Sequence, residues 1–125
     1  MRIRFQLMLG GLMAAHACAA DKLAAVPDFQ RDVAPIFEEK CNRCHGAKRR
    51  GGKLDMRTVE SLLKGGDTGP AIKPGNAKKS LLIELIHHKE MPPKKEGPFV
   101  TADELELLRR WIDAMSAQSV SVERK

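Results

Sequence analysis

The stretch Cys41-Asn42-Arg43-Cys44-His45 constrains this chain more than any other feature. The spacing Cys-x-x-Cys-His is the attachment signature of a c-type haem. Two thiols three residues apart lie on one side of a helical turn, where each can add to one haem vinyl group, and the histidine that follows can bind the iron. The sequence therefore predicts one covalent haem c on Cys41 and Cys44, with His45 as an iron ligand.

Other interpretations of the cysteine pair are a zinc site, a thioredoxin-type dithiol and a small disulfide loop. A structural zinc site normally needs four ligands, whereas the chain has three cysteines. His87 and His88 are the available extra ligands, but adjacent side chains on a helix point apart. A thioredoxin-type pair requires a βαβ context, and no strand pattern surrounds residues 41–45. A zinc-binding structural module stays an alternative.

The N-terminus has the features of an export signal. Arg2 and Arg4 precede an apolar run over residues 5–15, and small residues follow up to Ala20. This pattern predicts a signal peptide over residues 1–20, cleaved after Ala19 or Ala20. The run is too short to span a membrane, which takes about 20 residues. Haem is joined to the attachment motif outside the bacterial cytoplasm, so we expect a periplasmic protein. Lipidation at Cys18 is the alternative.

The remaining chain is long enough for one domain. We expect a linker over residues 21–28, the domain over 29–117 and a flexible tail over 118–125. After residue 20 the aromatic residues are Phe29, Phe37, Phe99 and Trp111. So few large side chains make a thin core, which a buried haem would fill.

Apolar periodicity predicts an all-α domain of about four helices, because no segment alternates as a strand would. The expected helices cover residues 33–44, 56–64, 77–89 and 101–117. Asp32 is the expected N-cap of the first, with Pro35 tolerated in its first turn. Thr101 and Glu104 form a predicted capping box for the last.

Met91 is the predicted second iron ligand. It precedes Pro92-Pro93 in a proline-rich loop, outside any packing pattern, whereas Met56 and Met115 are expected in the core. His87 and His88 are the alternative ligands, and either would give a lower potential than Met/His ligation does. The carbonyl of Pro70 is the expected hydrogen-bond acceptor for the other ring nitrogen of His45.

The formal net charge is +6. Removing residues 1–20 leaves 20 basic and 16 acidic residues, a balance of +4. Lysines cluster at residues 78–79, 89 and 94–95, where they could steer docking to an acidic redox partner protein. No basic stretch carries interleaved aromatic residues, which argues against nucleic-acid binding.

Taken together, the chain resembles a class I cytochrome c, and in detail the planctomycete-type cytochrome c domain. The matching stretches are residues 29–36, 41–46, 52–56, 62–66, 69–72, 74–76, 80–82, 91–93 and 105–112. The resemblance implies an all-α fold with crossed N- and C-terminal helices carrying Phe37 and Trp111. It also implies covalent haem on Cys41 and Cys44, with iron bound by His45 and Met91.

These observations predict a monohaem c-type cytochrome that transfers electrons in the periplasm. We see no nucleophile, no paired carboxylates in a cleft and no acid–base constellation, so we do not expect an enzyme. A haem-based sensor or a peroxidase-like module is the alternative with the same cofactor. Such a module would need iron that readily opens a coordination site.

Overall fold

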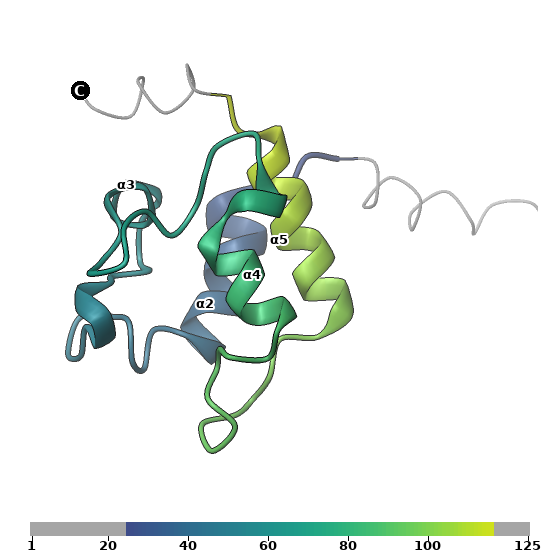
Figure 1. Ribbon diagram of the computed structural model, residues 1–125. Coiled ribbons are helices and arrows are strands. Elements are labelled where there is room, and N and C mark those ends of the chain that lie inside the picture. The colour runs from purple at the N-terminus through teal and green to yellow at the C-terminus, as the bar shows by residue number, and fades with distance from the viewer. Residues whose placement is uncertain (1–24, 117–125) are drawn as a thin grey trace, which may run out of the picture.

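The computed structural model describes residues 25–116, and this part of the chain contains helices and no strand. Its α-helices are α2 (Ala34–Lys40), α3 (Val59–Lys64), α4 (Leu81–His87) and α5 (Ala102–Ala114). Shorter helical turns are η1 (Phe29–Val33), η2 (Gly51–Lys53) and η3 (Ala77–Lys79). Helices α2, α4 and α5 form a bundle, and α3 belongs to an arm beside it (Figure 1). The predicted all-α class is therefore confirmed for the described residues.

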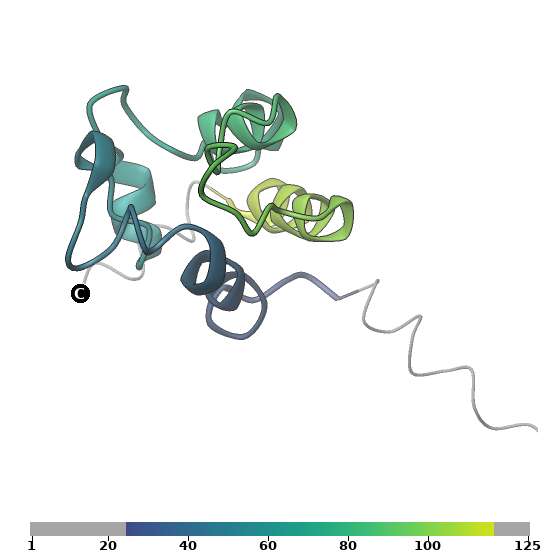
Figure 2. The same cartoon turned by 90° about the horizontal axis from the view of Figure 1, so that it is seen from below.

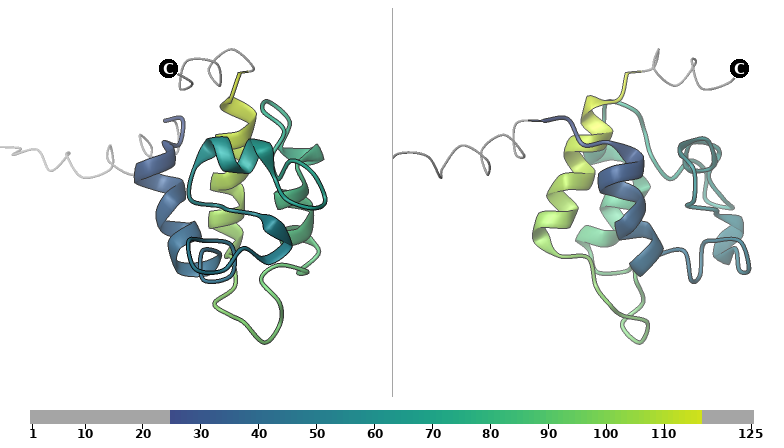
Figure 3. Two further views of the ribbon diagram at one scale, coloured as in Figure 1. Left: turned by 90° about the vertical axis from the view of Figure 1, so that its left-hand side faces the viewer. Right: turned by 180° about the vertical axis from the view of Figure 1, so that it is seen from behind.

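Seen from below, α5 lies between α2 and α4 (Figure 2). The arm, residues 41–76, leaves the bundle after α2 and returns to it at α4 (Figure 3). It is anchored by apolar side chains, because Leu62 and Ile72 are buried with those of the bundle. One core therefore joins the arm and the three helices.

The first helix begins earlier than the sequence predicted. A carboxylate oxygen of Asp28 accepts a hydrogen bond from the Arg31 amide at 2.8 Å, and the Asp28 amide donates to Asp32 at 2.8 Å. Asp28 rather than Asp32 is thus the N-cap, and it opens the π-helical turn η1. Pro35 lies in the first turn of α2, as predicted, but a helical turn precedes it.

An aromatic cluster holds the first and last helices together. Phe37 is fully buried and Trp111 is 5% exposed. Their ring centroids lie 6.4 Å apart in an edge-to-face arrangement, and Phe29 packs against both rings at 6.3 and 5.6 Å. Aromatic pairs prefer this geometry because ring edges and faces carry opposite partial charges. Three of the four aromatic residues predicted to lie in the domain are therefore used at this contact.

Helix α5 begins where the sequence predicted. The Thr101 hydroxyl accepts a hydrogen bond from the Glu104 amide, and the Glu104 carboxylate accepts one from the Thr101 amide at 2.8 Å. The helix ends at Ala114, three residues before the predicted end.

The predicted helix over residues 77–89 is interrupted at Ser80. Its hydroxyl donates to the Asn76 carbonyl at 2.9 Å and accepts from the Lys73 amide at 2.8 Å. These bonds hold the buried Ser80 in an extended conformation, which separates the short turn η3 from α4. The prediction of helical structure over residues 77–89 was therefore correct, but the structure contains two helical elements, η3 and α4, in place of one helix.

In the arm, α3 starts at Val59 rather than at the predicted Met56. The Met56 amide donates to the His45 carbonyl at 2.8 Å, which keeps Met56 out of the helix. The helix ends at Gly65, whose φ of 72° favours glycine, and a Cβ there would overlap the Gly69 carbonyl. This stop was predicted from the sequence.

No helix between residues 25 and 116 is long and apolar enough to cross a membrane. The expected signal peptide, the Cys18 lipidation site and the tail over 118–125 lie outside the described residues. Of the expected linker, residues 25–28 are described. Pro27 is buried, and the Ala25 carbonyl accepts a hydrogen bond from Arg110 at 2.6 Å.

Candidate functional site

The predicted attachment residues form a turn that follows α2. The helix ends at Lys40, and the amides of Cys41 and Asn42 both donate to the Phe37 carbonyl, at 2.9 and 2.8 Å. The His45 amide donates to the Cys41 carbonyl at 2.9 Å, so the turn closes within the motif. The prediction that the helix continues to residue 44 was wrong, because the backbone at residue 45 pairs with residue 50 instead.

The His45 ring is held by the loop that follows it. Its Nδ1 lies 2.9 Å from the Gly51 carbonyl oxygen, at hydrogen-bond distance. The Gly51 amide donates back to the Cys44 carbonyl at 2.7 Å, so the loop and the attachment turn are bonded on both sides of the ring. The prediction that the Pro70 carbonyl accepts this hydrogen bond was wrong, because the Gly51 carbonyl of the nearer loop occupies that position. An acceptor of this kind fixes the orientation of a metal-binding histidine.

The candidate site is a cleft made of two adjoining hollows. The inner hollow has about 660 Å³ of space, part of it open to solvent, and is lined by Cys41, Cys44, His45 and Met91 together with apolar residues. The outer hollow has about 1290 Å³, again partly open, and is lined by the arm and the loop over residues 91–97. Cys44, His45 and Met91 line both hollows. The structure therefore brings all four predicted site residues to one cleft.

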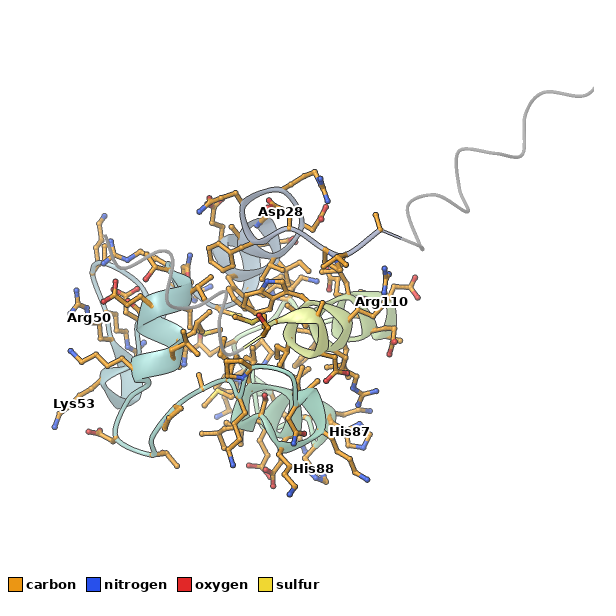
Figure 4. The ribbon with its side chains drawn as sticks, turned by 90° about the horizontal axis from the view of Figure 1, so that it is seen from above. Asp28, Arg50, Lys53, His87, His88 and Arg110 are labelled. Atoms are coloured by element: carbon orange, nitrogen blue, oxygen red, sulfur yellow. The ribbon has the colours of Figure 1, made fainter. Side chains whose placement is uncertain are left out.

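Met91 lies in the loop between α4 and α5. Its amide donates to the Leu85 carbonyl at 3.2 Å, the residue is 37% exposed, and the following Pro92 is buried. The alternative ligands His87 and His88 do not line the cleft, although His87 shares a neighbouring groove with Met91. His87 and His88 line a hollow on the other side of α4, and their ring centroids lie 5.3 Å apart (Figure 4). His45 lines neither that hollow nor the groove beside His87.

One comparison with known proteins covers the residues of this cleft. Residues 41–95 match the family model of planctomycete cytochrome C. This match supports a planctomycete-type cytochrome c domain in the chain. The match begins at Cys41 and ends beyond Met91, so it covers all the predicted site residues. No curated protein and no solved structure matches the chain significantly.

A cytochrome c domain implies haem c, and the residues of the cleft fit that group. Both cysteines are free thiols, as thioether formation requires. Helix α4 presents Leu82, Leu85 and Ile86 to the inner hollow, which gives the apolar wall that a porphyrin ring needs. Apolar residues lie on more than one side of α4, because one side of the helix faces the core and another faces the cleft.

Burial affects the ionisation of the Cys41 thiol. Burial raises the pKa of the Cys41 thiol to about 12, against the opposing effect of the neighbouring Lys40 charge. A buried thiol of this kind stays protonated and is a poor nucleophile at neutral pH.

The sequence analysis did not predict two ion pairs that lie at the cleft. Lys40 pairs with Glu104, and Arg43 pairs with Glu96 at 3.0 Å. One signal could have found the first pair, because Lys40 follows Phe37 by three residues on the apolar stripe of its helix. No comparable signal marks the second pair, because Arg43 and Glu96 are exposed charged residues without a pattern around them.

Among residues 25–116, no group of three histidine, cysteine or acidic side chains is arranged to hold a metal ion. A zinc site built from protein ligands alone, the alternative interpretation of the cysteine pair, is therefore unsupported by this part of the chain. Met91 is not a donor of that type, so the finding does not bear on ligation of haem iron.

Proposed function

We propose that this protein is a monohaem c-type cytochrome that transfers electrons in the periplasm. Cys41 and Cys44 hold the haem through thioether bonds, and His45 and Met91 bind its iron. The observation that carries the proposal is that these four side chains line one cleft, although Met91 is distant in sequence. The family match over residues 41–95 supports the c-type assignment.

When bound, the haem supplies a one-electron couple between ferric and ferrous iron, whose potential Met/His ligation raises. The residues of the chain orient and shield that group. The Gly51 carbonyl holds the His45 ring, and the apolar face of α4 excludes water from the cleft. Fixed ligands keep the structural change between redox states small. The proposal needs no proton transfer and no substrate, so we do not assign an enzymatic reaction.

Two finer features belong to the same proposal. We infer that α2 and α5 cross as the terminal helices of class I cytochromes c do, and the contact between Phe37 and Trp111 supports this. We also infer export by a signal peptide over residues 1–20, since haem attachment to this motif takes place outside the bacterial cytoplasm. Mass spectrometry of the mature protein distinguishes cleavage after Ala19 or Ala20 from lipidation at Cys18.

The test of the iron ligands is the absorption spectrum of the purified, oxidised protein. We expect a sulfur-to-iron charge-transfer band in the wild type and its loss in Met91→Ala. Met56→Leu is the matched control, because Met56 lines the same hollow but is 2% exposed and part of the core. That variant should keep the band.

Other outcomes point to other functions. A band that persists in Met91→Ala would assign the ligand to another residue. Rapid carbon monoxide binding by the reduced wild type would favour the sensor or peroxidase-like alternative. Colourless protein that contains zinc would refute the haem proposal altogether.

We further propose that an acidic redox partner docks at the mouth of the outer hollow. Arg49, Lys94 and Lys95 line that hollow. Lys78 and Lys79 line the hollow beside His87 and His88 instead, and Lys89 lines a separate groove with Lys94, so the predicted lysine cluster does not share one surface. Charges near the docking site raise the association rate in a salt-dependent way.

The matched experiment compares two double variants in electron transfer to an acidic redox protein at low ionic strength. Lys94→Gln/Lys95→Gln should lower the second-order rate several-fold and weaken its salt dependence. Lys78→Gln/Lys79→Gln removes the same charge from the hollow beside His87 and His88 and should change the rate less. Equal effects would mean that net charge alone, and not this surface, steers the partner.

A further inference from the structure

Among residues 25–116, Lys40 is the one lysine that is both ion-paired and largely buried. Its side chain is 6% exposed, and it lies at the end of α2, immediately before Cys41. A buried ammonium is costly unless acceptors surround it. The position therefore requires specific partners.

Those partners belong to the end of the Met91 loop. The Lys40 ammonium donates a hydrogen bond to the Phe99 carbonyl at 2.9 Å and a second one to the Glu104 carboxylate. The same carboxylate accepts from the Thr101 amide at 2.8 Å in the capping box of α5. Lys40 thus bonds the attachment side of the cleft to the point where the loop joins α5.

We propose that Lys40 is a positioning residue that holds the Met91 loop over the cleft and so keeps Met91 on the iron. The inference rests on the proposed ligation by Met91. The loop begins at a bond from the Met91 amide to Leu85 and contains no helix of its own. Its other end is bonded to the residue beside Cys41. Since Cys41 and His45 set where the haem lies, this bond sets where the loop lies relative to the haem.

A second tie offers an internal comparison. Arg43 pairs with Glu96 at 3.0 Å and also joins the attachment turn to the loop. Its side chain is 75% exposed and that of Glu96 is 39% exposed. Exposed ion pairs contribute little, because water competes for both charges. Charge-assisted hydrogen bonds away from water are stronger. We therefore assign the positioning role to Lys40 and not to Arg43.

The experiment measures the affinity of added imidazole for the oxidised holoprotein. Imidazole can bind only when Met91 leaves the iron, so its apparent affinity reports the fraction of open loop. Lys40→Met removes the ammonium group and keeps an unbranched side chain that is one atom shorter. We expect it to bind imidazole at least about ten-fold more tightly than the wild type, which corresponds to about 1.4 kcal/mol. The charge-transfer band should weaken in parallel, and Lys40→Arg should restore part of it.

Two controls separate positioning from general loosening. Arg43→Gln should stay within about two-fold of the wild type, since the pair that it removes is exposed. Phe37→Leu destabilises the bundle away from the loop and should also leave imidazole affinity within about two-fold. An increase in Phe37→Leu that matches the increase in Lys40→Met would overturn the inference.

A further variant keeps the test decisive if Lys40→Met accumulates poorly. Glu104→Gln retains an oxygen for the Thr101 amide and removes only the charge that faces Lys40, so imidazole affinity should rise several-fold. Wild-type affinity in Glu104→Gln would refute the role of Lys40. Failure of the ligation proposal looks different, because the band would then persist in Met91→Ala.

Discussion

Replacing Phe37 by leucine tests whether the aromatic cluster holds the first and last helices together. Phe37 is fully buried and packs edge to face against Phe29 and Trp111. Each aromatic pair contributes about 0.5–1.5 kcal/mol beyond the buried area, and the smaller side chain leaves part of its cavity unfilled. We expect Phe37→Leu to lower the free energy of unfolding by about 2 kcal/mol. For a domain of this size that lowers Tm by roughly 8–16 °C.

The assay is thermal and urea unfolding of the purified holoprotein, followed by circular dichroism. Phe99→Leu is the matched control, because Phe99 is an aromatic residue that is 53% exposed and outside the cluster. It should change the free energy of unfolding by less than about 0.5 kcal/mol. Equal losses in the two variants, or a loss below about 0.5 kcal/mol in Phe37→Leu, would refute the reasoning.

Two further predictions concern the loop around His45. The hydrogen bond from Arg57 lowers the pKa of Asp55 from 3.8 to about 2, so the native state favours the ionised carboxylate. The contribution of Asp55 to the free energy of unfolding is complete above pH 4 and is lost as the pH falls through 2. Urea unfolding at pH 6 should show Asp55→Asn less stable than the wild type by about 1 kcal/mol or less, because solvent screens the charges. This difference should shrink on acidification. In Gly51→Ala, the new Cβ would lie 3.4 Å from Cε1 of His45 and 3.3 Å from the Cys44 carbonyl oxygen. The ring must shift slightly, so we expect the free energy of unfolding to fall by about 1 kcal/mol and the ferric electron paramagnetic resonance spectrum to change. An unaltered spectrum would mean that the orientation of the His45 ring does not depend on this loop.

Local signals in the sequence predicted the helix ends that local bonds determine. Thr101 and Glu104 satisfy each other's backbone groups, so the start of α5 was predicted correctly. At the first helix, Asp28 and Asp32 are both residues that favour an N-cap position. The sequence could not show that the Asp28 carboxylate accepts from the Arg31 amide while the Asp28 amide donates to the Asp32 carboxylate. Ser80 interrupts a helical pattern because of bonds to a preceding turn, which periodicity does not reveal.

The residues of the candidate site were predictable from local sequence, whereas their partners were not. Five consecutive residues contain Cys41, Cys44 and His45, and a methionine in a proline-rich loop does not fit a packing pattern. The partners that hold these residues were not predictable. Gly51 supplies a carbonyl that any residue type would carry, and Lys40 finds its acceptors more than fifty residues away. Such contacts depend on how the elements pack, which a single sequence does not encode in its local patterns.

Helix α4 links the stability of this domain to its function. Ile83 faces the core, whereas Leu81 and Leu85 are half-buried and line the outer hollow. A helix that is apolar nearly all round is stable only when every side is covered, and protein atoms cover only part of this one. The uncovered part lies between His45 and Met91, where the haem is proposed to bind. On that reasoning the cofactor completes the core, so its two iron ligands also hold the arm and the loop against the bundle.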